Sequence, residues 1–396
     1  MPLPHNNWNY PTRMWFGDGR LADLPQGCRS LRMQRPLLVT DRGLAELDFV
    51  AQARTLLSAA GLGDIVYAGV DGNPALRHVE EGLAIYREAD CDGVIGLGGG
   101  SALDTAKAIA LVAHQSVSLW DLEDVGDNWR RADTARVAPI LAIPTTAGTG
   151  SEVGRASVIL DEAARTKKII FHPAMLPGLV ISDPALCCGL PPSITAWTGL
   201  DAFVHALEAY CAPGYHPMAE GIAMEAMALV LEWLPRAVAD GSDLEARGHM
   251  LAAASMGATA FQKGLGSIHS VSHVLGALYN THHGLANAVI LPYGLAQNAP
   301  YVEPRMGRLC RSLDIAGDST AALVDRLLSL RQELAIPHTL GELGIGRDDA
   351  AEIGERALQD ASTATNAGPV TATDLERLFL AAQDGNTGEL ALPDRG

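Results

Sequence analysis

Short apolar runs alternate with longer amphipathic stretches over the first half of the chain. The apolar runs predict strands over 36–40, 64–70, 93–97, 140–143, 156–160, 168–171 and 179–182. The amphipathic stretches predict helices over 44–60, 74–89 and 101–113. Strands separated by helices of this length are typical of right-handed βαβ units. This half is therefore predicted to be an α/β domain built on a parallel sheet.

The pattern changes near residue 190, after the run Gly189-Leu190-Pro191-Pro192. From there to the C-terminus the sequence indicates helix after helix, with almost no strand alternation. We therefore expect two domains, an α/β domain over 1–189 and an all-helical domain over 190–396. Within the first domain, the charged stretch 119–138 is expected to be a surface loop.

Residues 264–302 contain no Asp, Glu, Lys or Arg, although 19% of the chain is charged. Such a segment is expected to be buried, yet it holds His269 and His273, four positions apart and so on one helical face. A similar pair, Asp201 and His205, lies upstream, and Glu208 extends its polar stripe. A carboxylate and several imidazoles form the ligand set that divalent first-row metals prefer. The alternative for each pair alone is a core residue satisfied by the backbone.

Composition narrows the class of protein. The chain has 396 residues and a formal net charge of −17, so nucleic acid and anionic membranes are excluded as partners by repulsion. The N-terminal stretch MPLPHNNWNYPTRMW has no basic region followed by an apolar run, so a secretory signal is not expected. The histidines, proline and glycines within 264–302 argue against a membrane span. The six cysteines show no CxxC spacing, which indicates reduced thiols and a cytoplasmic protein.

Two glycine-rich loops follow predicted strands. Residues 96–101 read GLGGGS and lead directly into a predicted helix, where glycines and helix N-terminal amides favour a pyrophosphate. The loop lacks the third glycine of the common dinucleotide fingerprint and the Lys of a phosphate-binding Walker loop. The second loop, 144–152, reads PTTAGTGSE. Both would lie at the carboxyl ends of parallel strands, where such sheets bind ligands, although the first could also be a plain turn.

Four long motifs resemble those of the iron-containing (group III) alcohol dehydrogenase family. They are GLGGGSALDTAKA at 96–108, IPTTAGTGSEV at 143–153, TGLDAFVHALEAY at 198–210 and GLGSIHSVSHVLGALYNTHHG at 264–284. The resemblance spans nearly the whole chain. It implies a Rossmann-like nucleotide-binding α/β domain, an all-α C-terminal domain and an active-site cleft between them, in a dehydroquinate synthase-like architecture.

The resemblance also implies the metal site. The ligands by position are Asp201, His205, His269 and His283, holding ferrous iron or zinc. His273 is implied to lie beside the nicotinamide and to relay a proton. His282 stands where related sequences often have proline, so from the sequence either His282 or His283 could bind the metal; His283 is chosen because it directly precedes Gly284.

The cofactor contacts follow from the same resemblance. The residues implied to contact NAD are Asp41, Asn73, Gly98, Gly99, Gly100, Ser101, Asp104, Thr145, Thr146, Thr149 and Lys168. Asp41 would accept from the adenosine ribose hydroxyls and would repel a 2′-phosphate, which favours NAD over NADP. Outside this pattern, Asp41 would be a turn residue and Asp104 a helix cap.

The implied activity is hydride transfer between NAD(H) and a small primary alcohol, diol or hydroxy acid, or the matching aldehyde. Two alternatives keep the fold but change the chemistry: a metal-independent maleylacetate-type reductase and an NAD-using dehydroquinate-synthase-like lyase. A metal hydrolase is disfavoured, because the pair His269 and His273 lacks the Glu of HExxH enzymes. A homo-oligomer is expected from the family, and the aromatic N-terminal segment could pair with a second copy.

Overall fold

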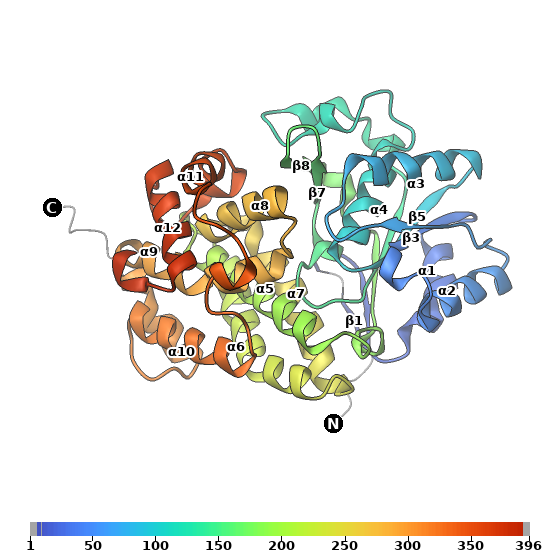
Figure 1. The fold of residues 1–396 in the computed structure, drawn as a ribbon. Coiled ribbons are helices and arrows are strands. Elements are labelled where there is room, and N and C mark those ends of the chain that lie inside the picture. The colour runs from blue at the N-terminus through green and yellow to red at the C-terminus, as the bar shows by residue number, and fades with distance from the viewer. Residues whose placement is uncertain (1–5, 9, 391–396) are drawn as a thin grey trace. The chain divides into compact units, whose positions relative to one another are not determined.

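The computed structural model describes residues 6–8 and 10–390, and the chain divides into two compact units (Figure 1). One unit holds the chain up to Gly189 together with Ser242–Leu251. The other holds Leu190–Gly241 and the chain from Ala252 onward. All named strands belong to the blue-to-green part of the chain in Figure 1, so the first unit carries the sheets and the second is helical.

The main sheet of the first unit has seven strands in the order β1-β2-β9-β6-β5-β3-β4. Their bounds are β1 Asn6–Trp8, β2 Met14–Phe16, β3 Pro36–Asp41, β4 Val66–Val70, β5 Gly93–Gly98, β6 Ile140–Pro144 and β9 Leu179–Ser182. Every pairing is parallel except that of β1 with β2. This parallel sheet, followed by a helical unit, confirms the predicted fold class.

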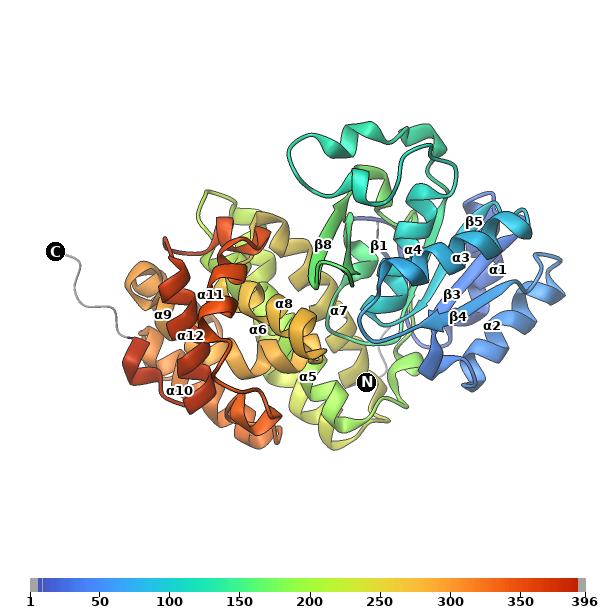
Figure 2. The same cartoon turned by 45° about the horizontal axis from the view of Figure 1, so that its top comes forward.

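Both faces of the sheet are covered by helices. The helices are α1 Leu24–Ser30, α2 Asp48–Ala59, α3 Leu76–Glu88 and α4 Gly100–Val112. Successive residues of β3 point to opposite faces: Leu37 and Val39 join the core under α3 and α4, and Leu38 joins the core under α1 and α2. Figure 2 shows these helices around β3 and β4. Near-continuous apolar runs such as β3 are what a strand buried on both faces requires.

The strand order reverses between β3 and β5. From β3 the chain moves to one neighbour, β4, and then crosses to the other, β5, from which the sheet continues to β6. Ligands of open parallel sheets bind outside the carboxyl ends of the strands at such a reversal. Asp41 ends β3 and Gly98 ends β5 at this point.

Two features of the first unit differ from a simple reading of the sequence. The strands β7 Ala156–Asp161 and β8 Thr166–Phe171 pair with each other as a separate antiparallel hairpin instead of joining the parallel sheet. The N-terminal strands β1 and β2, which the apolar pattern did not predict, extend the main sheet beside β9. Each is three residues long, too short to show a period.

The second unit is all-helical in the part of the chain that the structure describes. Its helices are α5 Pro192–Cys211, α6 Pro217–Ala239, the end of α7 Leu244–Ala260, α8 Ser267–Tyr279, α9 His283–Ser312, α10 Thr320–Glu333, α11 Ala350–Leu358 and α12 Ala372–Asp384. The uncharged stretch forms α8 and the first half of α9, and most of its side chains are buried. This burial confirms the expectation from its composition.

Helix α9 needs external support because Pro292 lies inside it. Proline has no N–H and disturbs the hydrogen bonds of the preceding turn. In that turn, the fully buried Arg331 of α10 donates from Nη1 to the carbonyl of Val289 at 2.7 Å. The same guanidinium donates from Nη2 to the His338 carbonyl at 3.3 Å. Arg331 thus fixes the helix whose first turn carries His283.

Helices α5 and α7 approach closely at Gly257. A Cβ at this position would lie 2.9 Å from the Ala202 carbonyl oxygen and 3.3 Å from the His205 Cβ. Both neighbours belong to the segment of α5 that carries Asp201 and His205. The absence of a side chain at Gly257 therefore sets the position of that segment.

We expect Gly257→Ala to lower the free energy of unfolding by about 1–3 kcal/mol, because the new methyl group is forced against backbone that cannot yield. Gly221→Ala on α6 is the matched control, since its Cβ would meet nothing within 4 Å. The control should be neutral or stabilising by roughly 0.5–1 kcal/mol, the helix-propensity gain of Ala over Gly. Urea unfolding of both variants measures the difference, and equal stability of the two would contradict the close approach.

Candidate metal centre and nucleotide-binding loops

Four side chains converge inside the second unit. Asp201 and His205 lie one turn apart on α5, His269 lies on α8, and His283 is the first residue of α9. One ligand atom from each lies within 4.8 Å of all the others. The helical spacing of the first pair gives both side chains one face, and the two other helices deliver one imidazole each.

The spacing of these atoms suits a small divalent ion. The Asp201 Oδ1 lies 3.9 Å from His205 Nε2, 4.0 Å from His269 Nε2 and 3.7 Å from His283 Nε2. A tetrahedron with the metal–ligand bonds of about 2.0–2.2 Å that zinc makes has edges of roughly 3.3–3.6 Å. The donor set is therefore slightly expanded, and a contraction of a few tenths of an ångström would close it around an ion.

Asn287 gives an independent sign that this donor set fits a cation. Its amide Nδ2 lies 2.7 Å from Asp201 Oδ1, 3.1 Å from His283 Nε2 and 3.2 Å from His269 Nε2. One amide nitrogen has two hydrogens and cannot serve three acceptors. Its own Oδ1 is buried and has no hydrogen-bond partner within the described residues. Electron-rich atoms that crowd one donor in a buried site are the arrangement that a positive ion satisfies.

Glu208 orients the imidazole of His269 through the ring nitrogen that faces away from the other ligand atoms. Its Oε2 lies 2.6 Å from His269 Nδ1, and its Oε1 accepts from the Ile268 backbone N–H at 2.8 Å. This contact leaves Nε2 of His269 to face the other ligand atoms, as in carboxylate–histidine–metal arrangements. Burial alone would lower the pKa of His269, but the hydrogen bond and charge of Glu208, with the charge of Asp201, raise it above its ordinary value.

His283 has a similar partner and is the most exposed member of the group. Its Nδ1 lies 3.0 Å from the Ser272 hydroxyl, so Nε2 again faces the other ligand atoms. The His283 side chain is 25% exposed, whereas those of Asp201, His205 and His269 are 3%, 4% and 1% exposed. A small molecule therefore reaches the group from the side of His283.

His282, the neighbour that the sequence left open, lies outside the group. It is the N-cap of α9, where its Nδ1 accepts from the Leu285 N–H at 3.4 Å. Its ring packs against Trp197 at a centroid distance of 5.2 Å. His282 thus fixes the start of the helix whose first residue is His283.

His273 lies against two of the converging imidazoles. Its ring stacks on that of His283 at 5.3 Å and meets that of His269 edge-on at 5.9 Å. Its Nδ1 lies 2.8 Å from Asp360 Oδ2. Asp360, like Asn287, was not singled out from the sequence.

The first glycine-rich loop joins β5 to α4 in the first unit. Gly98 has φ +155°, and a Cβ there would lie 2.5 Å from Asp41 Oδ2 and 2.7 Å from Ala102 Cβ. A Cβ at Gly100 would lie 2.5 Å from the Thr149 hydroxyl of the second loop. Side chains at these positions would fill the space in front of the α4 N-terminus, where backbone N–H groups and the helix dipole favour an anion.

The second loop and the segment after β4 border the first loop. Thr145 is buried and donates from its backbone N–H to the Gly98 carbonyl at 3.0 Å. Gly99 faces Thr146, whose side chain would lie 3.4 Å from a Cβ there. The Ser101 hydroxyl donates to the Gly72 carbonyl at 2.8 Å, which places the neighbouring Asn73 segment beside the loop. The two loops lie at the carboxyl ends of β5 and β6, as the sequence predicted, and the segment that holds Asn73 follows the carboxyl end of β4.

Asp41 completes this edge of the sheet. Its Oδ2 accepts from the Gly99 backbone N–H at 3.2 Å. Burial raises the pKa of Asp41 to about 7, and the hydrogen bond from Gly99 opposes part of that rise. The carboxyl group is therefore poised to ionise near neutral pH.

Two residues predicted to contact the cofactor also have partners within the protein, and their contacts with the cofactor stay predictions. The Asp104 oxygens accept from the Ser151 hydroxyl at 2.5 Å and the Val158 N–H at 2.9 Å, so this carboxylate joins α4 to the second loop and to β7. Lys168, on β8, forms ion pairs with Asp161 at 3.1 Å and Glu123 at 3.6 Å. A ribose contact by Lys168 stays a prediction.

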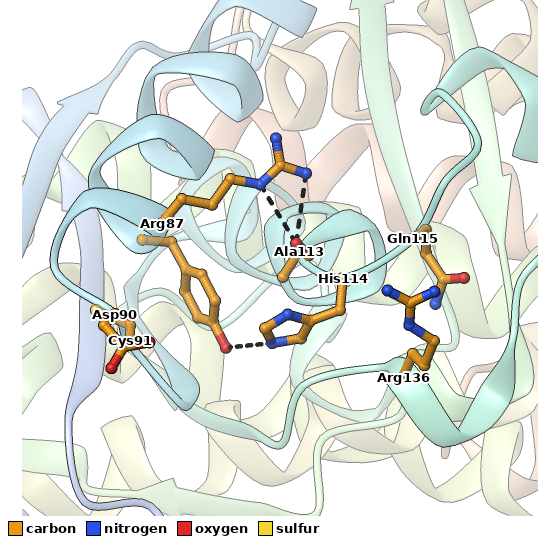
Figure 3. Close-up of a pocket in the computed structure, with 8 residues that line it drawn as sticks. Arg87, Asp90, Cys91, Ala113, His114, Gln115 and Arg136 are labelled. Atoms are coloured by element: carbon orange, nitrogen blue, oxygen red, sulfur yellow. Dashed lines mark hydrogen bonds between the residues drawn. The ribbon is translucent and has the colours of Figure 1, made fainter.

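A separate cavity of about 350 Å³ opens near the amino end of β5, at the opposite end of that strand from Gly98 (Figure 3). His114 Nε2 and the Tyr86 hydroxyl lie 3.2 Å apart on its wall. Arg87 donates to the Ala113 carbonyl at 3.4 Å. None of the residues predicted from the sequence as site residues lines this cavity.

The fold and the two clusters define a class of protein that has an α/β unit with glycine-rich loops of the nucleotide-binding kind and a helical unit with a largely buried His₃Asp group. Comparison with known families agrees. Residues 11–184 match the model described as iron-containing alcohol dehydrogenase, and residues 195–383 match that described as Fe-containing alcohol dehydrogenase family, C-terminal. The chain belongs to the iron-containing alcohol dehydrogenase family.

Individual relatives agree over nearly their full lengths. The chain is 37% identical to the 4-hydroxybutyrate dehydrogenase of Cupriavidus necator, covering 93% of this chain and 98% of that protein. It is 33% identical to the NAD-dependent methanol dehydrogenase of Bacillus methanolicus, covering 94% and 98%. The crystal structure of a 1,3-propanediol oxidoreductase superimposes with a TM-score of 0.88 at 32% identity, covering 96% and 100%. Among the described residues, no helix has both the length and the apolar character that crossing a bilayer requires.

We expect Glu208→Gln to weaken metal binding by about 10- to 100-fold, the usual effect of removing such an outer partner. The carboxylate accepts from both Ile268 and His269, whereas Gln has one acceptor oxygen and must turn its NH₂ group toward one of these donors. Competition with a zinc chelator at fixed pH measures the affinity. Glu225→Gln, an exposed change on α6, is the control. Equal affinity of the two variants would contradict the orienting role of Glu208.

Proposed function

We propose that the protein is a metal-dependent oxidoreductase that transfers a hydride between NAD(H) and a small primary alcohol, diol or hydroxy acid, or the matching aldehyde. The proposed metal is ferrous iron, with zinc as the competing ion, held by Asp201, His205, His269 and His283. The single observation that carries this proposal is the convergence of these four ligand atoms within 4.8 Å in the largely buried interior of the helical unit.

Substrate class is inferred from the site and the relatives together. The relatives are named for 4-hydroxybutyrate, methanol and 1,3-propanediol, all short molecules with a primary hydroxyl group. A divalent ion supplies Lewis acidity that stabilises negative charge on a substrate oxygen. The partial exposure of His283 lets such an oxygen approach the ligand group. The other three side chains are buried, which keeps water away from the rest of the group.

The first unit is proposed to bind the cofactor. The α4 N-terminus with Gly98, Gly99, Gly100 and Ser101 would hold the pyrophosphate, since its amides point at the space that the glycines leave open. Asp41 would accept hydrogen bonds from the adenosine ribose and repel a 2′-phosphate, which selects NAD. Thr145, Thr146 and Thr149 would line the cofactor site. We also propose that the protein forms a homo-oligomer.

The competing chemistries make different use of this site. A maleylacetate-type reductase works without metal and has no need of the complete His₃Asp group. A dehydroquinate-synthase-like lyase returns NAD to its starting state within each turnover. The retained ligand set argues against the first, and net cofactor reduction separates the proposed function from the second.

The purified protein should reduce NAD with short primary alcohols, diols or hydroxy acids, and chelation should abolish this activity. Adding ferrous iron or zinc should restore it, because the ion stabilises charge on the substrate oxygen. Absorbance of the reduced nicotinamide measures the rate. Asp201→Ala is the matched variant, which should lose metal and activity but keep NAD binding, since Asp201 lies outside the nucleotide loops.

Three outcomes would contradict the proposal in different ways. Full activity after complete chelation would indicate a metal-independent reductase. Bound metal without net NAD reduction or oxidation, across the alcohols and their aldehydes, would indicate lyase chemistry. Full activity of Asp201→Ala would exclude Asp201 as a ligand.

Affinity for NAD should increase with pH up to neutrality. The pKa of Asp41 is raised to about 7 by burial, so the group is protonated below that pH, whereas ribose hydroxyls bind best to the ionised form. NAD binding should therefore tighten by up to about tenfold per pH unit below pH 7 and level off above it. Fluorescence titration between pH 5.5 and 8.5 measures this slope.

Asp41→Asn should remove that slope and improve relative affinity for NADP, because the amide neither ionises nor repels a 2′-phosphate. Asp48→Asn, an exposed change in the first turn of α2, is the control and should keep the slope. A pH dependence that survives in Asp41→Asn would assign it to another group.

A further inference from the structure

Only one of the two ring nitrogens of His273 has a hydrogen-bond partner among the described residues. Its Nδ1 lies 2.8 Å from Asp360 Oδ2, and both side chains are largely buried, with exposed fractions of 9% and 13%. Its Nε2 makes no hydrogen bond within the described part of the chain. The ring itself stacks on His283, the ligand on the accessible side of the proposed metal group. The open nitrogen therefore belongs to a ring that borders the proposed reaction site.

Asp360 is fixed in place by its own surroundings. Its Oδ1 accepts from the Ser362 backbone N–H at 2.8 Å, which makes it the N-cap of the 3₁₀ helix η11, Ala361–Thr365. The Thr363 hydroxyl donates to the Ser270 hydroxyl of α8 at 2.6 Å. Thr365 bonds the Leu265 backbone N–H at 3.0 Å and carbonyl at 2.9 Å. These contacts tie η11 to α8, which carries His273, and to the segment just before α8.

The hydrogen bond between Asp360 and His273 determines which nitrogen of His273 carries the hydrogen. Burial would raise the pKa of Asp360, but the charge and hydrogen bond of His273 and the contacts of Ser362 lower it below its ordinary value. An ionised carboxylate only accepts hydrogen bonds, so Nδ1 of His273 must carry the hydrogen. In the neutral imidazole, Nε2 then carries the lone pair.

We propose that Asp360 is a positioning residue that holds His273 in the Nδ1–H tautomer, with Nε2 ready to accept the hydroxyl proton of the substrate. This inference rests on the proposed function. During oxidation, the carbinol hydrogen leaves with its electron pair for NAD⁺, the hydroxyl proton passes to Nε2, and the carbon–oxygen single bond becomes a carbonyl. The resulting imidazolium is stabilised by the Asp360 carboxylate until it releases the proton to water.

The two oxygens of Asp360 allow this role to be separated from simple capping. In Asp360→Asn, the side-chain oxygen can still accept from Ser362 and keep the cap. The amide NH₂ then faces His273 Nδ1 and donates to it, which forces the hydrogen onto Nε2. The variant thus preserves the fold of η11 and reverses the tautomer of one imidazole.

The experiment compares the wild type, Asp360→Asn and the control Asp374→Asn, all loaded with zinc. Asp374 is also a buried capping aspartate, whose Oδ2 accepts from Thr371, and among the described residues no hydrogen bond or ion pair joins it to a histidine. Nitrogen-15 NMR of histidine-labelled protein reports the tautomer, with the His273 signals identified by their loss in His273→Gln. We expect Nδ1–H in the wild type and in Asp374→Asn, and Nε2–H in Asp360→Asn.

Kinetics give the second readout. In Asp360→Asn, kcat should fall by about 10²- to 10⁴-fold, the range attributed to a positioned proton acceptor and to a wrong tautomer. KM and zinc content should change little, because the ligands and the substrate contacts are intact. Asp374→Asn should keep both kcat and the wild-type tautomer.

Two results would overturn the inference: the Nε2–H tautomer in the wild type, or a reversed tautomer in Asp360→Asn with unchanged kcat. The wild-type spectrum decides the first point even if Asp360→Asn does not fold. It also needs no substrate, so the absence of alcohol oxidation would count against the proposed function while the tautomer measurement still tests the position of His273.

Discussion

The arrangement of the helical unit depends on the free-energy cost of bringing four electron-rich ligand atoms together in a largely buried interior. Asp201, His205 and His269 are almost fully buried, and a buried carboxylate among lone pairs is unfavourable without a positive partner. Glu208 and Ser272 hold the outer nitrogens of two imidazoles so that the inner nitrogens face one another. The helices around them therefore build a site whose own protein donors, such as Asn287, do not satisfy it.

The first unit also holds a buried acidic group whose hydrogen-bonding capacity the protein satisfies only in part. Asp41 is held at the carboxyl end of β3 beside the amide of Gly99, and burial raises its pKa to about 7. A carboxyl group left short of hydrogen bonds is ready for a ligand that donates them, as ribose hydroxyls do. In each unit, then, polar groups that the protein satisfies only in part mark the place where a ligand completes them.

Much of the fold and part of the candidate metal site could be predicted from the sequence, because both depend on local periodicity. The parallel strands are apolar runs long enough to identify, and the spacing of Asp201 and His205 places both on one helical face. The sequence does not distinguish β7 and β8 from sheet strands, since a hairpin and a parallel strand share the same apolar pattern. It also leaves His282 and His283 equivalent, because the N-cap geometry that separates them depends on where α9 begins.

Residues that act through long-range contacts could not be found in this way. Asp360 meets His273 across 87 positions of the chain, and nothing in its local sequence distinguishes it from an ordinary helix-capping aspartate. Asn287 did leave a signal, because it lies four residues after His283 in an uncharged stretch and so shares its helical face. A polar residue at that spacing in a buried helix needs a partner, and the neighbouring ligand is the nearest one available.

The outer partners also explain why the helical unit extends so far beyond the ligands themselves. The ligands come from α5, α8 and the start of α9, yet His273 is held from η11 and α9 is braced by Arg331 of α10. Each contact restricts an imidazole or a helix that would otherwise have several orientations of similar energy. Proton and hydride transfer tolerate only small errors in position. The later helices therefore affect the proposed reaction indirectly, because they fix the positions of residues that belong to other helices.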